Sequence, residues 1–244
     1  ERFVNILEQA VRKNFIKWQY EVSTTCNIIA KYFPEKGLKL YFDLVLIELQ
    51  NEEVKIDSSQ RSLTGSYYDV LPSIYEKIPC HVLLFTTDFF ERVLSGSYLG
   101  ERSLFDSPFN LLYYQHSITV GLSAFYAWYK NKMIEFCSNL TKEAKQLIKK
   151  LQKSKWETQR QLSMLCKVSN ISFFKDDISS YIKCILKSDF NNPEIGKQYE
   201  LFIRTIGKVF EVLSSQEKDE IIDLLLKLEF DDELEVSAWN WRPL

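Results

Sequence analysis

One cysteine and one histidine stand side by side in this chain, Cys80 and His81. A thiol beside an imidazole is the pair that cysteine nucleophiles use, with the imidazole taking the thiol proton. The order Ile78-Pro79-Cys80-His81 predicts a short strand, and successive side chains of a strand point to opposite faces. The two groups would then be separated by the strand itself. We therefore expect both side chains to pack in the core, and we expect no catalytic residue here.

The other residue types that bind metals or cofactors are scattered. The two histidines, His81 and His116, and the five cysteines include no Cys-x-x-Cys pair, so we expect no zinc site. Carboxylates cluster at 176–177, where acids would favour a helix start, and at 231–235, which is typical of a solvated acidic segment. The chain contains no glycine-rich phosphate loop and no Gly-x-Ser-x-Gly motif. The sequence predicts a protein that is not an enzyme and holds neither metal nor cofactor.

A lysine-rich segment between residues 142 and 160 is the clearest charge pattern. Lys145, Lys149 and Lys153 recur at helical spacing, and Trp156 follows them. Basic side chains together with an aromatic ring are typical of nucleic-acid binding. A solvated helix face is the simpler interpretation, because acidic residues elsewhere bring the net charge to −2. A nucleic-acid contact through these four residues therefore stays open, although nucleic acid is not the partner we expect.

Two tryptophans near the C-terminus, Trp239 and Trp241, follow the acidic residues of 231–235. Large aromatic side chains in such a place either dock on the protein's own core or are presented to a partner protein. Docking is the interpretation we favour, and a partner motif remains the alternative. Deletion of residues 239–244 would separate the two, because only a docked pair contributes to stability.

Composition is that of an ordinary globular protein with a large core. The 244 residues are 45% hydrophobic and 14% aromatic, and seven glycines and six prolines are too few for a sandwich or a barrel. Five widely spaced cysteines indicate reduced thiols, so we expect the cytoplasm or the nucleus. The longest apolar run, 118–128, is too short to cross a bilayer, and we expect no membrane contact. The chain begins at Glu1 rather than at a methionine, so we expect a fragment.

Hydrophobic spacing predicts helices and a few short strands. Residues 1–33 have the period of an amphipathic helix, which Pro34 and Gly37 are expected to end. Residues 41–49, 54–56 and 78–81 are predicted as strands. Further helices are predicted after Asp88, Pro108 and Asn192-Pro193, with caps at Thr141 and at Ser214 followed by Glu217. We find no internal repeat.

The residues of the first half carry a resemblance to a known family. They are Asp43, Leu44 and Leu46 in the first strand, Pro79, Cys80 and His81 in the third, and Phe89, Phe90, Leu94, Ser95 and Gly96 in the helix that follows. In this order they resemble the front half of a BTB/POZ domain, over about residues 42–101. The chain departs from the family at Val82, where a basic residue is usual, and in the long connection at 57–77. The resemblance implies a protein-interaction module, and implies that Leu99 and Glu101 dock a cullin-type scaffold.

These observations together predict an α+β protein that is predominantly α-helical, with a small BTB-like sheet and helical hairpin followed by a helical bundle. The expected parts are an N-terminal helix at 1–39, a BTB-like domain at 40–140, and a helical domain at 141–244 with an acidic, tryptophan-containing tail. We expect a non-catalytic adaptor or scaffold whose partners are proteins, as a homodimer or on a cullin-type scaffold. Leu99, Glu101, Trp239 and Trp241 are the expected contacts. The alternative is an all-helical subunit of a larger assembly that touches nucleic acid through 142–160.

Overall fold

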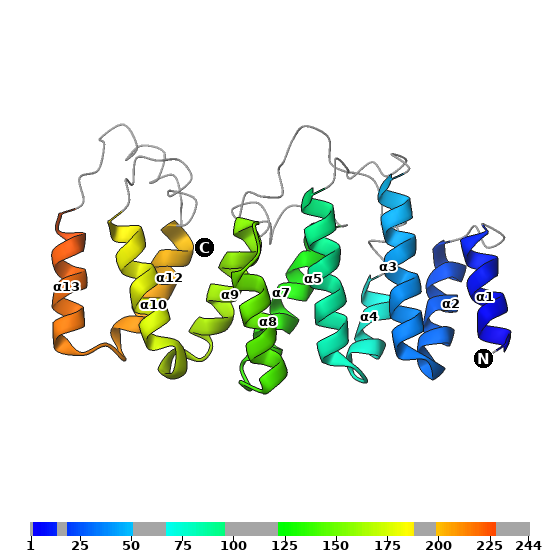
Figure 1. Cartoon of the computed structure of the whole chain (residues 1–244), viewed down its shortest axis with the longest axis horizontal. Coiled ribbons are helices and arrows are strands. Elements are labelled where there is room, and N and C mark those ends of the chain that lie inside the picture. Colours follow the sequence, from blue (N-terminus) through cyan, green and yellow to red (C-terminus); the bar gives the residue numbers. More distant parts are fainter. Residues whose placement is uncertain (1, 14–18, 51–66, 96–121, 188–198, 228–244) are drawn as a thin grey trace. The chain divides into compact units, whose positions relative to one another are not determined.

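The computed structural model describes residues 2–13, 19–50, 67–95, 122–187 and 199–227, and all regular structure in these ranges is helical (Figure 1). The helices are α1 (Arg2–Arg12), α2 (Gln19–Tyr32), α3 (Pro34–Gln50), α4 (Tyr67–Tyr75), α5 (Pro79–Ser95), α7 (Leu122–Cys137), α8 (Lys142–Gln152), α9 (Glu157–Val168), α10 (Ile171–Leu186), α12 (Tyr199–Phe210) and α13 (Ser215–Leu225).

The predicted α+β fold with a BTB-like sheet is wrong, because the described ranges contain no strand. Residues 41–49 lie in α3, and Cys80 and His81 lie in the first turn of α5. An apolar run with no clear period fits a buried strand and a buried helix equally well. The prolines decide between them here. Pro34 and Pro79 are the first residues of α3 and α5, the position where a fixed φ favours a helix and the missing N–H costs nothing.

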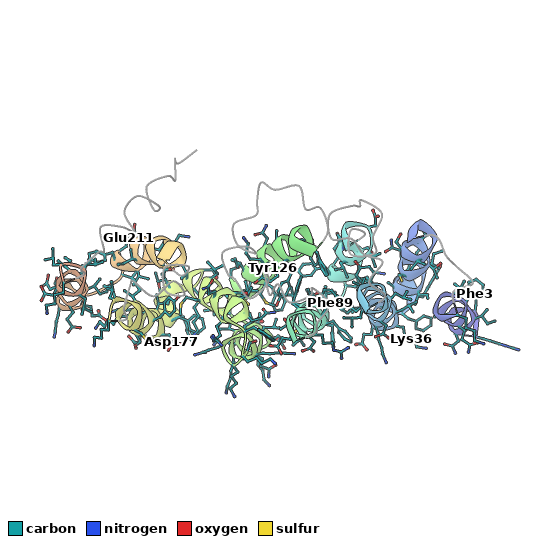
Figure 2. All side chains as sticks on the ribbon, turned by 90° about the horizontal axis from the view of Figure 1, so that it is seen from above. Phe3, Lys36, Phe89, Tyr126, Asp177 and Glu211 are labelled. Carbon is teal, nitrogen blue, oxygen red and sulfur yellow. The ribbon has the colours of Figure 1, made fainter. Side chains whose placement is uncertain are left out.

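The chain divides into two compact units, Glu1–Leu162 and Ser163–Leu244. In the first unit, three helical hairpins pack against one another: α2 with α3, α4 with α5, and α7 with α8. Figure 2 shows two rows, with α2, α4 and α7 in one and α3, α5 and α8 in the other. Contacts between α2 and α4, between α3 and α5, and between α5 and α8 join neighbouring hairpins. The described part of this unit is therefore a two-layered stack of hairpins.

Aromatic side chains fill the space between the two layers. Phe89 is 2% exposed and Phe90 is 1% exposed, so both rings are buried. The Phe90 ring lies 5.0 Å from the centroid of Tyr126, 5.3 Å from that of Phe125 and 5.4 Å from that of Tyr129. Edge-on and tilted contacts of this kind add to the gain from burial alone. The α5 and α7 helices are joined mainly through these rings.

The α2–α3 hairpin is exceptionally tight at Gly37. A β-carbon at this position would lie 2.5 Å from the Ala30 β-carbon and 2.7 Å from the Ala30 α-carbon. Gly37 was expected to end a helix, but it lies in the first turn of α3. The residue is needed for the close approach of two helices rather than for a helix end.

The second unit is held by a smaller apolar core. Its buried members are Met164, Ile178, Ile182, Leu186, Val209, Leu213 and Ile221. The α10 helix contacts both α12 and α13. The predicted capping box is present at the start of α13, where Ser214 and Glu217 satisfy each other's backbone N–H groups. The start predicted at 192–193 lies outside the described residues.

Candidate binding surface

The most regular charged surface of the described residues is on α8. Its N-cap is Thr141, whose hydroxyl accepts from the Ala144 N–H at 3.1 Å, as predicted. One face of the helix buries four apolar side chains, Ala144, Leu147, Ile148 and Leu151. This burial fixes the rotation of α8 and directs the opposite face to solvent.

The exposed face carries four lysines, Lys142, Lys145, Lys149 and Lys153, which we call the lysine ridge. Their positions are three or four residues apart, so all four project from one side of the helix. At 1.5 Å per residue the ridge is about 16 Å long. All four belong to the lysine-rich segment predicted from the sequence, and three of them were named there as a nucleic-acid contact. Four cations along one exposed face favour an acidic ligand.

Lys150 lies at the edge of the ridge and does not belong to it. Its ammonium lies 2.5 Å from the Asp88 carboxylate of α5, so its charge is balanced within the protein. Such an exposed pair contributes little to stability. Its consequence here is geometric, because it separates the ridge from the packed side of α8.

Trp156 is half-buried, and the exposed Arg160 binds within the protein rather than beside the ridge. The Lys155 ammonium lies 4.7 Å from the centroid of the Trp156 ring, which is half-buried. Arg160 donates to the carbonyls of Ser154 at 3.0 Å and of Lys155 at 2.8 Å, and so closes the turn between α8 and α9. Trp156 lies in that turn, beyond the end of the ridge. The structure therefore groups the three predicted lysines and places the predicted tryptophan apart from them.

Cys80 and His81 do not form a pair. They are adjacent residues of α5, and neighbours in a helix project about 100° apart. The pKa of the Cys80 thiol is raised, first by burial and then by the nearby Glu143 and Cys137, which favours the unreactive protonated form. His81 was expected in the core, and that is wrong: its ring is exposed and its Nε2 lies 3.5 Å from Glu35. The helix turns His81 outward where a strand would have turned it inward.

A polar cavity of about 300 Å³ lies between α2 and α4, lined by Asn27, Lys31, Asp69, Ser73 and Lys77. Its polar groups bind one another: the Asn27 amide donates to the Asp69 carbonyl at 2.8 Å, and the Ser73 hydroxyl donates to Asn27 at 3.3 Å. The Lys77 ammonium donates to the Lys31 carbonyl at 3.0 Å, at the negative end of the α2 dipole. These hydrogen bonds join α2 to α4 and to the turn after it. The polar groups that line the cavity therefore hold the two helices together, and we assign them no ligand.

Among the residues that the structure describes, no three histidine, cysteine or acidic side chains lie close enough together to hold a metal ion. No described helix is long and apolar enough to span a bilayer. The predicted contacts Leu99, Glu101, Trp239 and Trp241 lie outside the described residues, as does His116.

The fold and its surface define an architecture rather than a family. The first unit is a stack of helical hairpins with an exposed row of lysines. Comparison with protein-family models, with curated proteins and with solved structures finds no match for this chain.

Proposed function

We propose that this protein is a non-catalytic helical scaffold, and that the lysine ridge of α8 binds an acidic segment of a partner protein. The observation that carries the proposal is the ridge itself, since its four cations face solvent along one side of a helix that is fixed by burial of the other side. Opposite charge along such a row accelerates encounter and sets the orientation of the partner.

The architecture supports the same function by analogy. Stacks of helical hairpins present extended surfaces to their partners, because each hairpin adds a helix to the exposed row. The fold alone does not define a function. The analogy therefore supports the proposed function, whereas the lysine ridge remains the observation on which the proposal rests.

An acidic protein segment fits the ridge better than a nucleic acid does. Bases are held by stacking on open aromatic faces and on arginine, whose planar group also binds phosphate with two hydrogen bonds. The nearest aromatic ring, Trp156, is half-buried beneath Lys155, and Arg160 is used within the α8–α9 turn. The ridge lysines attract carboxylates and phosphates alike, so the lack of an open aromatic face beside them is what favours the acidic protein segment. Nucleic-acid contact through Lys145, Lys149 and Lys153 remains the second candidate.

Binding of a labelled glutamate-rich peptide, measured by fluorescence anisotropy at several salt concentrations, tests the proposal. Lys145→Glu, Lys149→Glu and Lys153→Glu together should weaken binding at least about tenfold. The matched control carries Lys39→Glu, Lys187→Glu and Lys208→Glu, which change the net charge equally at exposed positions elsewhere. The control should bind as the parent does.

Two results would contradict the proposal. Equal losses in the ridge variant and in the control would show a general charge effect without a defined surface. Tighter binding of a single-stranded or duplex oligonucleotide than of the peptide, at one salt concentration, would promote the nucleic-acid candidate. Circular dichroism of each variant establishes that α8 is still folded.

The cysteines support a reducing compartment. All five are free thiols, and Cys26, Cys137 and Cys166 are buried. Free thiols without disulfides are typical of proteins in the cytoplasm or the nucleus. Either location is consistent with a scaffold that binds protein partners, and cellular imaging of the tagged chain tests it.

A further inference from the structure

The first described helix, α1, exposes two large apolar side chains. Phe3 is 65% exposed and Ile6 is 57% exposed, although Val4 on the adjacent side is buried. In Figure 2, α1 lies in the row of α3, α5 and α8, and Phe3 marks the helix at the end of that row. The Lys36 ammonium of α3 donates to the Asn5 side chain at 3.4 Å, an exposed hydrogen bond between α1 and α3. Phe3 and Ile6 therefore project from α1 into solvent.

Basic residues border this apolar stripe. Arg2 and Lys13 are exposed, one at each end of α1. At 100° per residue, both project within about 40° of Ile6. We call Phe3, Ile6, Arg2 and Lys13 the basic-edged stripe.

The last described helix, α13, has a stripe of the opposite charge. Ile222 is 40% exposed and Leu226, directly after the helix, is 79% exposed, whereas the neighbouring Ile221 is buried in the core of the second unit. Asp219 and Asp223 precede these two residues by three positions each, so both carboxylates border the stripe on one side. Both carboxylates are exposed. We call Ile222, Leu226, Asp219 and Asp223 the acidic-edged stripe.

Burial of these exposed apolar side chains against another surface would be favourable. Exposed apolar side chains that adjoin one another on a helix promote association. The two stripes match each other in length, with apolar side chains three or four residues apart. The fully exposed charges at their edges have opposite signs, and Lys218, on the other side of Ile222, is only partly exposed. Each stripe is a poor match for itself, since like charges would face each other.

We infer that this chain associates head to tail, with the basic-edged stripe of one copy docked on the acidic-edged stripe of a second copy. The contact is heterologous, so each copy retains one free stripe and can add a further copy. A single helix pair is a small interface, and such interfaces are weak and transient. The inference rests on α1 and α13 and does not depend on the lysine ridge.

Sedimentation velocity over a range of concentrations tests the inference, and a charge exchange makes the test specific. The weight-average mass of the parent protein should rise with concentration. Arg2→Glu with Lys13→Glu, or Asp219→Lys with Asp223→Lys, should weaken association at least about tenfold. An equimolar mixture of the two variants should associate again, because opposite charges then meet at both contacts. The variant with all four changes should also associate with itself.

The apolar residues are tested by a second pair of variants. Phe3→Ser with Ile6→Ser removes one stripe, and Ile222→Ser with Leu226→Ser removes the other. Each variant should be monomeric alone, and their mixture should stop at a one-to-one dimer, because only one intact contact remains. Phe173→Ser is the matched control, since Phe173 is exposed outside both stripes. It should associate like the parent.

Three outcomes would overturn the inference: a parent protein that stays monomeric at all concentrations, a charge exchange that fails to restore association, or a control that loses association equally. The ridge variant with Lys145→Glu, Lys149→Glu and Lys153→Glu should still associate. Its result separates this inference from the proposed binding of an acidic partner.

Discussion

Phe90 is a buried member of the aromatic core of the first unit. It is 1% exposed and contacts three aromatic rings of α7. Phe90→Ala should reduce the free energy of unfolding by about 3–5 kcal/mol, through lost burial and through the cavity left among rings that cannot collapse. Urea unfolding followed by circular dichroism measures the change. Phe173→Ala, at an exposed ring, should change the same quantity by less than about 0.5 kcal/mol.

The ion pair of Lys167 and Asp177 should respond unequally to loss of its two members. The Lys167 side chain is 3% exposed, its ammonium lies 2.8 Å from the Asp177 carboxylate, and the Asp177 side chain is half exposed. Asp177→Asn should cost about 1–3 kcal/mol, because it leaves a buried cation without its counter-charge. Lys167→Met should cost less than about 1 kcal/mol, because it removes that charge and keeps the packing. The opposite order in chemical unfolding would show that Lys167 is hydrated.

Among the helices, α13 has an acid-sensitive start. Hydrogen bonds from the Ser214 side chain, and then from Lys175, lower the pKa of Glu217 to about 2. A lowered pKa means that ionised Glu217 stabilises the folded helix above its ordinary value of 4.5. That contribution is lost as the pH falls from 4.5 towards 2. The helix should therefore loosen in this range even where the rest of the protein is unaffected.

Ser214→Ala should move the Glu217 pKa upward towards its ordinary value, since it removes the strongest of these hydrogen bonds. Titration of the Glu217 carboxyl signal by NMR measures the shift. The control is Ser215→Ala, one position further along at an exposed site. A Glu217 pKa that does not move in the Ser214 variant would show that Lys175 and the backbone N–H of residue 214 hold the carboxylate without the hydroxyl.

Local signals made some helices predictable from sequence and left others ambiguous. The cap at Thr141, the box of Ser214 and Glu217, and the lysine spacing of α8 depend on residues within one or two turns, and the structure contains all three. Residues 41–49 of α3 and 78–81 at the start of α5 were wrongly predicted as strands, because their apolar residues have no dominant period and the pattern alone could not decide. Packing against neighbouring hairpins decides it instead, and that information is not local.

For the candidate surfaces too, the features set by local spacing were predictable and those set by packing were not. The period of the lysines predicted the ridge, since its face is set by the helix itself. The half-buried state of Trp156 depends on the turn with Arg160 and Lys155, which spacing does not reveal. For α1, the apolar period predicted an amphipathic helix including Phe3 and Ile6, but not that these side chains stay uncovered. Whether an apolar face is covered depends on the other helices.

For the molecule as a whole, the two units should unfold in separate transitions. Their cores share no member, since the aromatic core lies before Leu162 and the smaller apolar core after it. In calorimetry, Phe90→Ala should lower the melting temperature of the first unit alone. Ile182→Ala, in the core of the second unit, should lower the melting temperature of the second unit alone. One transition shifted equally by both variants would show that the units fold as one.

The close approach at Gly37 restricts which residues can occupy this position as the sequence evolves. A side chain there would meet the Ala30 β-carbon at 2.5 Å, and also the Ala30 α-carbon and backbone nitrogen at 2.7 Å. Gly37→Ala should therefore cost about 1–3 kcal/mol in urea unfolding. Ala30→Gly should not restore the loss, because it removes the β-carbon and leaves the backbone in place. No exchange at position 30 can compensate for a change at position 37. In any descendant that keeps this hairpin, we expect the glycine to persist alone, without a covarying partner.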